Sequence, residues 1–370
     1  MKYIINIAAI LVMLIASDCL LAQGADRTVR IAVAGTSHAH VSWILGHKKQ
    51  NDFEVVGIYE TDERLIRRQV AQYKLDSTLV YKDLVTMLDK VKPDAVVAFG
   101  SIYDHMKVVE AAAPRGIHVM VEKPLATNVK HVLKMEQLAK KHKVHVLTNY
   151  ETSWYPTTEK INQLVHDSAY LGEIRKVVIH DGHEGPKEIG VNKEFLDWLT
   201  DPVQNGGGAL IDFGCYGANL MTYLMKGEEP VSVTAVSATF KPDIYPKVDD
   251  ETTIIVSYPK AQCIIQASWN WPFSRKDMEV YGQTGYLIAA DNSILRKRNR
   301  DSKGERTVKI DTAEVDVYTD PFIYLADVIR GKITVPRFGL YSLENNIMVV
   351  RILEAARESA RTGKTVMFRK

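Results

Sequence analysis

The chain has 370 residues, of which 25% are charged and 46% are hydrophobic, and its formal net charge is +2. This length exceeds that of a usual single domain and predicts two domains with ample cores. The near balance of 47 basic and 45 acidic side chains excludes the strong positive field of a nucleic-acid-binding protein.

The N-terminal segment, residues 1–22, has the pattern of an export signal. Lys2 supplies a positive start, an apolar run follows, and Ala22 offers a small residue for cleavage. The apolar run is shorter than the roughly 20 residues that a membrane-spanning helix needs. We predict Sec-type export to the periplasm, with no stable membrane insertion after signal removal. A lipid anchor at Cys19 ranks second, because an aspartate precedes it where a small residue is expected.

Between residues 28 and 148, apolar strand-like runs alternate with helix-like segments. The strand-like runs are 29–34, 53–59, 79–81, 95–99, 117–121 and 144–148. Helices are expected over 39–48, over 62–73, after 79–81 and from 128 onward. This alternation predicts a parallel sheet with right-handed crossovers, that is, a doubly wound Rossmann-type domain over 28–148.

The pattern changes after Asn149, where strand-like runs follow one another directly. These runs are 174–180, 231–240, 252–258, 262–269, 278–282 and 286–290. Consecutive strands predict a large, mainly antiparallel open sheet, and hence an α+β domain over 149–370. A long helix is expected over 342–362, ended by Gly363. Acidic residues closely follow the basic run 296–300, so we interpret that run as a solvated loop or hairpin.

The first strand ends in a turn that resembles a dinucleotide-binding loop. Such a loop has the pattern G-x-G-x-x-G, and here only the first glycine is kept, with Ser37 and His40 in place of the other two. The exposed N–H groups at the start of the following helix still favour an anion. The candidate cofactor residues in this turn are Gly35, Thr36, Ser37, His38 and His40.

Glu60 ends the second strand, at the position where an acidic residue binds the ribose hydroxyls of a dinucleotide. A carboxylate there disfavours a 2′-phosphate, so the sequence favours NAD over NADP. The alternative is that Glu60 only begins the next helix.

Two short motifs carry candidate catalytic groups. Glu122-Lys123-Pro124 follows a strand, and a lysine at the end of a buried strand can direct its ammonium into a cleft. The glycines at 206–208 precede a predicted helix on which Asp212 and Tyr216 are four positions apart and share a face. A tyrosine pKa near 10 is too high for a base at neutral pH, and we expect the Lys123 ammonium to lower it. The alternative is a buried tyrosine with a satisfied hydroxyl and an aspartate that caps the helix.

In this order the features resemble the Gfo/Idh/MocA oxidoreductase family, over essentially the whole mature chain. The D-x-G-x-Y-x-x-N pattern from Asp212 to Asn219 is similar to the glucose–fructose oxidoreductase branch, in which a tyrosine replaces the commoner histidine. The resemblance implies that Lys123 and Tyr216 transfer protons and polarise the reacting C–O bond, while Asp212 orients a sugar hydroxyl. It also implies a nicotinamide dinucleotide that exchanges hydride with a sugar carbon, and a homo-oligomer formed through the open sheet face.

Further candidate residues are expected around this centre. Those assigned to the cofactor are Gly100, Ser101, His105 and Glu122. Those assigned to a sugar substrate are Glu151, Trp154, Tyr155, His180, His183 and Asn219. The run 180–186 holds several ionisable residues, but no further ligand pattern supports a metal, and we expect none.

An export signal and a nicotinamide cofactor fit poorly together, because soluble NAD is scarce outside the cytoplasm. We therefore predict a tightly held cofactor that is regenerated within each cycle of sugar or glycoside oxidation. One alternative is a redox-neutral glycoside hydrolase or lyase that acts through a keto-sugar. A second alternative is a sugar-binding protein without catalysis on the same fold.

Overall fold

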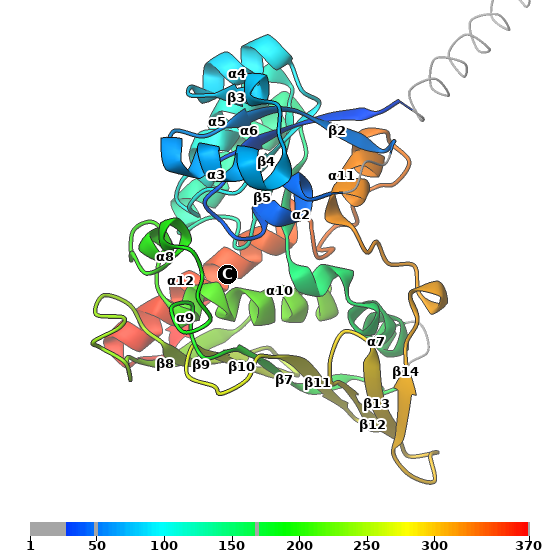
Figure 1. The fold of residues 1–370 in the computed structure, drawn as a ribbon. Coiled ribbons are helices and arrows are strands. Elements are labelled where there is room, and N and C mark those ends of the chain that lie inside the picture. The colour runs from blue at the N-terminus through cyan, green and yellow to red at the C-terminus, as the bar shows by residue number, and fades with distance from the viewer. Residues whose placement is uncertain (1–26, 48–50, 167–169, 369–370) are drawn as a thin grey trace, which may run out of the picture.

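The computed structural model describes residues 27–47, 51–166 and 170–368. Its two sheets lie in separate halves of the molecule, and between them lie α9 Ala209–Asp212, α10 Gly214–Leu224 and α12 Leu343–Thr362 (Figure 1). The expected export segment, with Cys19, lies outside the described residues. Within the described part, no helix has the length and apolar character needed to cross a bilayer.

The N-terminal sheet is parallel, as predicted, and its six strands lie in the order β3-β2-β1-β4-β5-β6. The order reverses between β1 and β4, which places a crevice at the carboxyl ends of these strands. The strands are β1 Val29–Ala34, β2 Phe53–Tyr59, β3 Val80–Tyr81, β4 Ala95–Ala98, β5 His118–Glu122 and β6 Val146–Asn149.

Helices flank this sheet, and side-chain caps define several of their starts. Asp62 and Asn128 each accept N–H groups of the first turn that follows them. The helix predicted over 39–48 is much shorter, because α2 ends at Leu45 and Gly46 follows as its cap. The helices of this half are α2 Val41–Leu45, α3 Glu63–Tyr73, α4 Leu84–Val91, α5 His105–Ala112 and α6 Val129–His142, with short 3₁₀ turns η1 Ser77–Leu79 and η2 Ala113–Arg115.

The C-terminal sheet has nine strands in the order β14-β13-β12-β11-β7-β10-β9-β8-β15. All neighbours are antiparallel except β7 and β10, which confirms the mainly antiparallel sheet. The basic run 296–300 lies largely in β13, which forms a hairpin with β14. The strands are β7 Ile174–Gly182, β8 Ser232–Ala238, β9 Glu251–Ser257, β10 Gln262–Ser268, β11 Arg275–Gly282, β12 Gly285–Ala289, β13 Ile294–Asn299, β14 Arg306–Lys309 and β15 Val366–Met367.

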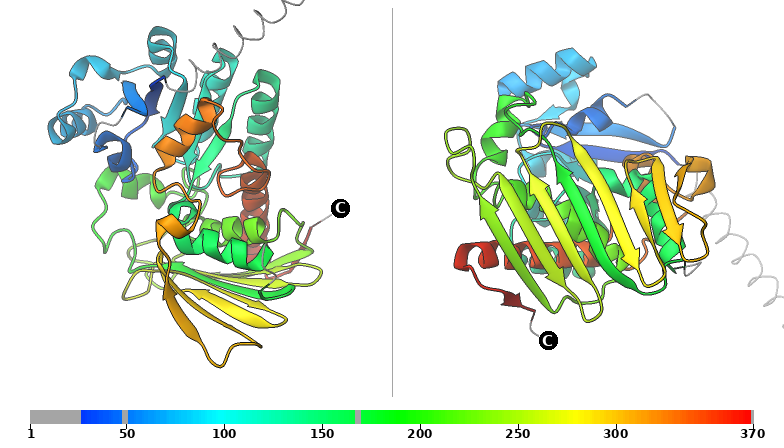
Figure 2. Two further views of the ribbon diagram at one scale, coloured as in Figure 1. Left: turned by 90° about the vertical axis from the view of Figure 1, so that its right-hand side faces the viewer. Right: turned by 90° about the horizontal axis from the view of Figure 1, so that it is seen from below.

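Helices cover one face of this large sheet, and the other face is open (Figure 2). The covering helices include α10 and α12, which pack on β10 and β8 respectively. Helices α7, α8 and α11 were not predicted from the sequence. The helices and 3₁₀ turns of this half are η3 Glu151–Trp154, α7 Pro156–His166, α8 Lys193–Leu199, α9 Ala209–Asp212, α10 Gly214–Leu224, η4 Thr312–Glu314, α11 Pro321–Ile329 and α12 Leu343–Thr362.

The C-terminal part of the chain joins the two sheets. Helix α12 begins at its cap Ser342 and contacts both α6 and α10. Just before it, the carbonyl of Tyr341 accepts the N–H of Thr148 in β6. The sheets therefore share a packed interior, and the end of β5 faces α9 and α10 across it.

Candidate active site

Lys123 and Asp212 form a buried ion pair where the two halves of the molecule meet. Lys123 directly follows β5, and its Nζ donates to one carboxylate oxygen of Asp212 and to the Asp212 carbonyl at 3.0 Å. The other carboxylate oxygen accepts the indole N–H of Trp269 at 3.0 Å. Both side chains of the pair are 7% exposed. Both carboxylate oxygens thus accept a hydrogen bond from the protein, and the carboxylate holds Lys123 in place.

Charge complementarity keeps both partners ionised despite their burial. Burial lowers the pKa of Lys123, but the larger combined effect of the Asp212 charge, its hydrogen bond and weaker neighbouring groups raises it, so the net pKa of Lys123 is raised. Burial likewise opposes the carboxylate, and Lys123 outweighs it, so the pKa of Asp212 is lowered. Lys123 is therefore an ammonium at neutral pH, which can donate hydrogen bonds but cannot accept a proton.

Tyr216 lies beside this pair, although not on one continuous helix with Asp212. The helix breaks at Phe213, so Asp212 ends α9 and Tyr216 belongs to the first turn of α10. Lys123 Nζ is 5.2 Å from the centroid of the Tyr216 ring. No described residue forms a hydrogen bond with the Tyr216 hydroxyl, which therefore stays available to a ligand.

The expected lowering of the Tyr216 pKa is wrong. Burial raises the pKa of Tyr216 well above 10, and the negative charges of Asp181 and Glu151 add to the effect. The Lys123 ammonium lies over the ring rather than at the hydroxyl. Tyr216 is thus a neutral phenol at neutral pH, which can donate a hydrogen bond or relay a proton.

The turn after β1 keeps the geometry that a dinucleotide requires at its first glycine. Gly35 has φ +77°, and a Cβ there would lie 2.8 Å from the backbone N of Gly100 at the end of β4. The backbone N–H groups of Ser37 and Ala39 have no acceptor among the described residues. A cavity of about 60 Å³ lies beside this turn, lined by Gly35, Tyr59, Gly100, Asp104, His105 and Lys107 among others. These features fit a nucleotide at the carboxyl ends of the strands.

Glu60 follows β2, as predicted, but both of its carboxylate oxygens already accept hydrogen bonds from neighbouring residues. One carboxylate oxygen accepts the N–H and the hydroxyl of Thr36, at 2.9 and 2.8 Å. The other oxygen accepts the N–H groups of Thr61 and Asp62. Glu60 therefore holds the turn in shape, and only a rearrangement would free it to bind a ribose hydroxyl.

His38, His40 and Glu122 form a cluster between the turn and Lys123. His40 Nδ1 lies 3.0 Å from Glu122 Oε2, and Glu122 Oε1 accepts from the Asn149 amide at 2.8 Å. Burial lowers the pKa of both histidines well below 6.5, so they are neutral. Candidate ligand atoms of the three residues lie within 4.8 Å of one another, the spacing of a metal site. Internal hydrogen bonds account for this closeness, because His38 Nδ1 also accepts the backbone N–H of His40.

Two other predicted cofactor residues are held by neighbours. His105 is fully buried, its Nδ1 lies 3.2 Å from the Leu125 carbonyl, and its Nε2 has no partner among the described residues. Burial lowers the pKa of His105 to about 4. Ser101 donates to the side chain of Gln204 at 2.7 Å, a contact that links the turn after β4 to the C-terminal half.

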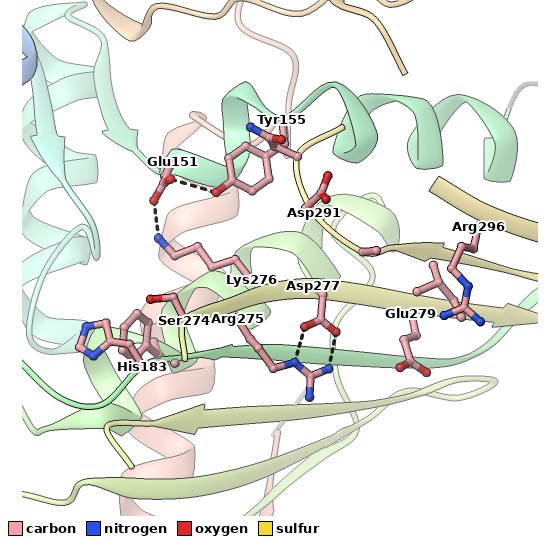
Figure 3. Close-up of a pocket in the computed structure, with 15 residues that line it drawn as sticks. Glu151, Tyr155, His183, Ser274, Arg275, Lys276, Asp277, Glu279, Asp291 and Arg296 are labelled. Carbon is pink, nitrogen blue, oxygen red and sulfur yellow. Dashed lines mark hydrogen bonds and ion pairs between the residues drawn. The ribbon is translucent and has the colours of Figure 1, made fainter. Parts of the chain in front are cut away.

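A cavity of about 720 Å³ opens next to the Lys123 centre (Figure 3). At its inner end Lys276 forms an ion pair with Glu151, which also accepts the Tyr155 hydroxyl at 2.9 Å. Lys276 Nζ is 4.7 Å from the centroid of the Tyr216 ring, so this end adjoins the buried centre. His183 and Phe213 line the same cavity. Of the six predicted substrate residues, Glu151, Tyr155 and His183 thus lie together.

The other three predicted substrate residues do not line this cavity. Trp154 donates its indole N–H to the Asn149 side chain at 3.1 Å. His180 Nδ1 lies 2.9 Å from Asp277 Oδ2, on the strand face opposite to Asp181. Asn219 is fully buried and donates to the Leu340 carbonyl at 2.9 Å. Its assignment to the substrate is corrected, because its amide ties α10 to the segment before α12.

Two residues of this site, Trp269 and Lys276, were not singled out in the sequence, and Asp181 was noted only as part of the ionisable run 180–186. Trp269 ends the β10 run and holds Asp212, while Asp181 and Lys276 lie opposite each other on β7 and β11. Strand alternation carried a signal for Asp181, because it shares a face with the buried Ile179. No local signal marked Lys276, since its strand was expected to begin only at residue 278.

Comparisons with known proteins agree with this geometry. The model of an oxidoreductase family with an NAD-binding Rossmann fold, GFO/IDH/MocA, matches residues 29–150. The model of the GFO/IDH/MocA C-terminal domain matches residues 158–288. Together the two matches span more than half of the chain.

The chain is similar to trans-1,2-dihydrobenzene-1,2-diol dehydrogenase of Xenopus tropicalis, with 30% identity over 47% of the chain. That match covers 49% of the frog enzyme, so the chain spans about half the length of this relative. It is also similar to the D-xylose 1-dehydrogenase [NADP(+)] of Haloarcula marismortui, at 22% identity over 71% of each protein. An inositol dehydrogenase homologue from Azotobacter vinelandii, solved with NAD+, shares the fold with a TM-score of 0.81 and 18% identity, over 93% of this chain and 99% of that one.

Proposed function

Because the chain belongs to the Gfo/Idh/MocA family of oxidoreductases, we propose that it is an exported enzyme that oxidises or reduces a sugar or glycoside. The observation that carries the proposal is the buried Lys123–Asp212 pair beside the unpaired Tyr216 hydroxyl. Binding alone does not require an ammonium and a phenol to be held together out of water. The polar cavity next to them gives a hydroxyl-bearing substrate a place to bind.

The residues have distinct tasks in this proposal. The Lys123 ammonium donates a hydrogen bond to the reacting oxygen and so polarises the C–O bond, and the Tyr216 hydroxyl exchanges a proton with that oxygen. Asp212 keeps Lys123 charged and in place. Lys276, Glu151 and Tyr155 bind the remaining hydroxyls. When bound, the nicotinamide supplies the hydride acceptor or donor.

The cofactor is proposed to be NAD, held by the turn from Gly35 to His40 and by Gly100, His105 and Glu122. The Glu60 carboxylate at the end of β2 would repel a 2′-phosphate, which favours NAD over NADP. The Haloarcula relative is named for NADP, so the choice needs a direct test. We also propose that the cofactor is held tightly and regenerated in each cycle, because export would place the enzyme where soluble NAD is scarce. The open sheet face is proposed to form a homo-oligomer.

Analysis of the nucleotide that purifies with the full chain tests this proposal. The protein is denatured, and the released nucleotide is identified by mass spectrometry. We expect stoichiometric NAD, and an absorbance change at 340 nm when sugars or glycosides are added before denaturation. Absence of nucleotide, together with no rise in melting temperature on adding NAD, would contradict the oxidoreductase assignment. Net hydrolysis of a glycoside without a net change at 340 nm would favour the redox-neutral alternative.

A further inference from the structure

Asp181 is a buried carboxyl group that the proposed function does not yet use. It lies near the end of β7, it is 1% exposed, and its Oδ1 has no hydrogen-bond partner. No hydrogen bond joins either of its oxygens to the described residues. A buried carboxylate without a partner is costly, and such groups are uncommon outside functional sites.

Asp181 lies on the strand against which the helix of Tyr216 packs. Asp181 shares the covered face of the sheet with Ile179, and Lys276 is its partner across the β7–β11 pair. Helix α10 packs on β7 and β10 over this face. Leu220, one turn after Tyr216 on α10, lines the same small cavity of about 20 Å³ as Asp181.

This small cavity adjoins the substrate cavity. Lys276, Tyr155 and Asp277 line both, so the Asp181 carboxyl lies just behind the inner end of the larger cavity. Lys276 also contacts the Tyr216 ring. The inner end of the substrate cavity therefore adjoins both the Tyr216 ring and the Asp181 carboxyl group, and a relay requires the Tyr216 hydroxyl to form a hydrogen bond with Asp181.

The neighbouring groups are poor final acceptors for that proton. Lys123 is already an ammonium, and both carboxylate oxygens of Asp212 accept hydrogen bonds. Tyr216 is a neutral phenol, which can pass a proton on but cannot keep a second one. His183 uses its Nδ1 to accept the N–H of Gly185 at 2.8 Å, so its other ring nitrogen carries the proton. Asp181 alone among these groups is a carboxyl group whose oxygens accept no hydrogen bond from the described residues.

We propose that the Asp181 carboxylate is the base that finally accepts the proton of the substrate hydroxyl, with Tyr216 as the relay. In oxidation, the hydroxyl proton moves to the Tyr216 oxygen while the Tyr216 proton moves to Asp181. The hydride leaves the same carbon for the nicotinamide, and a C=O bond remains. In reduction the protonated Asp181 returns the proton by the same route. The inference rests on the proposed function, and it assigns that function its acid–base group.

The electrostatic surroundings suit this task. Burial raises the pKa of Asp181 well above 3.8, while Lys276 and Lys123 act in the opposite direction. The group can therefore gain and lose a proton nearer to neutral pH than an exposed aspartate. Asp181 is also, after burial itself, the first cause of the raised Tyr216 pKa. The titratable and charged groups around Asp181 are Lys276, Lys123, Asp212, Glu151, Tyr155, Cys215 and Tyr216, together with His180, Asp277 and Asp291, which line the same small cavity.

The variant Asp181→Asn tests the proposal, because an amide keeps the shape of the carboxyl group but cannot accept the proton. With the full chain carrying its own nucleotide, we expect the rate of sugar oxidation to fall about 100-fold or more. In the wild type this rate should rise with pH through a pKa above the usual aspartate range, and the variant should lose that rise. Asp181→Glu should keep it. The exposed Asp243→Asn serves as the matched control and should change neither rate nor pH profile.

A measurement without substrate separates a chemical role from a structural one. The folded state holds the Asp181 proton above the pH at which the unfolded chain loses it, so wild-type stability falls as pH rises through that window. Asp181→Asn removes the titrating group, so its stability should not fall with rising pH for this reason. Its melting temperature should exceed that of the wild type by a margin that grows from about pH 4 toward neutrality. A lower melting temperature at neutral pH would show instead that Asp181 is a structural residue.

The outcomes distinguish the two levels of the proposal. If the wild type neither retains a nucleotide nor changes at 340 nm with any sugar, the proposed function fails. If the wild type is active and Asp181→Asn keeps its rate and its pH dependence, only the role of Asp181 is overturned.

Discussion

Lys123 is the residue whose task follows most directly from its surroundings. Its position after a strand was enough to predict an ammonium in a cleft, but not the partner that controls it. The structure shows that Lys123 and Trp269 each donate to one carboxylate oxygen of Asp212, and the expected orientation of a sugar hydroxyl by Asp212 stays a prediction. The roles of Lys123 and Asp212 are therefore coupled, and replacing one changes the other.

Lys123→Met should abolish activity and also destabilise the fold. The variant leaves the Asp212 carboxylate buried with only the Trp269 N–H, which costs about 3–5 kcal/mol of unfolding free energy. The loss should shrink as pH falls, because the unpaired carboxyl group then takes up a proton. Urea unfolding at several pH values measures this.

The double variant Lys123→Met/Asp212→Asn provides the control. It removes both charges, so it should regain most of the lost stability while staying inactive. Equal instability of the single and double variants would show that the pair is not the cause.

At the scale of elements, the turn after β1 combines a degraded motif with a preserved shape. Its first glycine is required by both backbone conformation and space, because Gly100 of the neighbouring loop touches the place of a Cβ. The missing glycines are compensated by neighbours. Ser37 accepts the Trp198 indole N–H at 3.0 Å, and the His40 ring stacks on Trp43 with centroids 3.5 Å apart.

Gly35→Ala should therefore destabilise the protein more than Gly116→Ala. Both glycines have positive φ, +77° and +71°. An alanine in this left-handed conformation lowers the free energy of unfolding by about 1–2 kcal/mol at either position. Only at Gly35 does the new Cβ also meet backbone, whereas nothing lies within 4 Å at Gly116. We expect an additional loss of about 1–3 kcal/mol for Gly35→Ala, measured by urea unfolding. Equal losses would mean that the two loops separate easily.

At the scale of the whole molecule, a segment of the C-terminal half reaches across to the cofactor turn. We call residues 186–205, which include α8, the strap. Glu194 of the strap pairs with Arg68 of α3 at 3.2 Å, and Trp198 donates to Ser37. Gln204 accepts from Ser101, and its carbonyl accepts the N–H of Tyr103. Figure 1 shows α8 next to the N-terminal domain below α3.

Trp198→Ala should loosen the strap and let the nucleotide exchange. The large indole packs against the ring of His38, with centroids 5.7 Å apart, and closes the turn on this side. We expect the wild type to keep its nucleotide through gel filtration and Trp198→Ala to lose it, with Trp198→Phe in between. Phe240→Ala, at a residue 67% exposed, is the control. Full retention in Trp198→Ala would show that the strap does not hold the cofactor.

Local patterns alone were sufficient for the strands of the N-terminal sheet, for β7 to β12 and for the order of the chemical motifs. They did not predict β14 or β15, and the run that holds most of β13 was interpreted as a loop or hairpin. Strand-like runs such as 29–34 and 53–59 match β1 and β2, because apolar periodicity and turn residues act over a few positions. Lys123, Asp212 and Tyr216 were found for the same reason, since each lies at a recognisable position within its own element.

The remaining features depend on contacts between distant segments. The second hydrogen bond to the Asp212 carboxylate comes from Trp269. Asp181 and Glu151 contribute to the raised pKa of Tyr216. The ion pair of the strap joins α8 to α3. Burial and charge at one residue are sums over neighbours that only the folded chain brings together. That is why the sequence supplied the catalytic candidates, while their protonation states and the proposed base emerged only from the packing of α10 on β7.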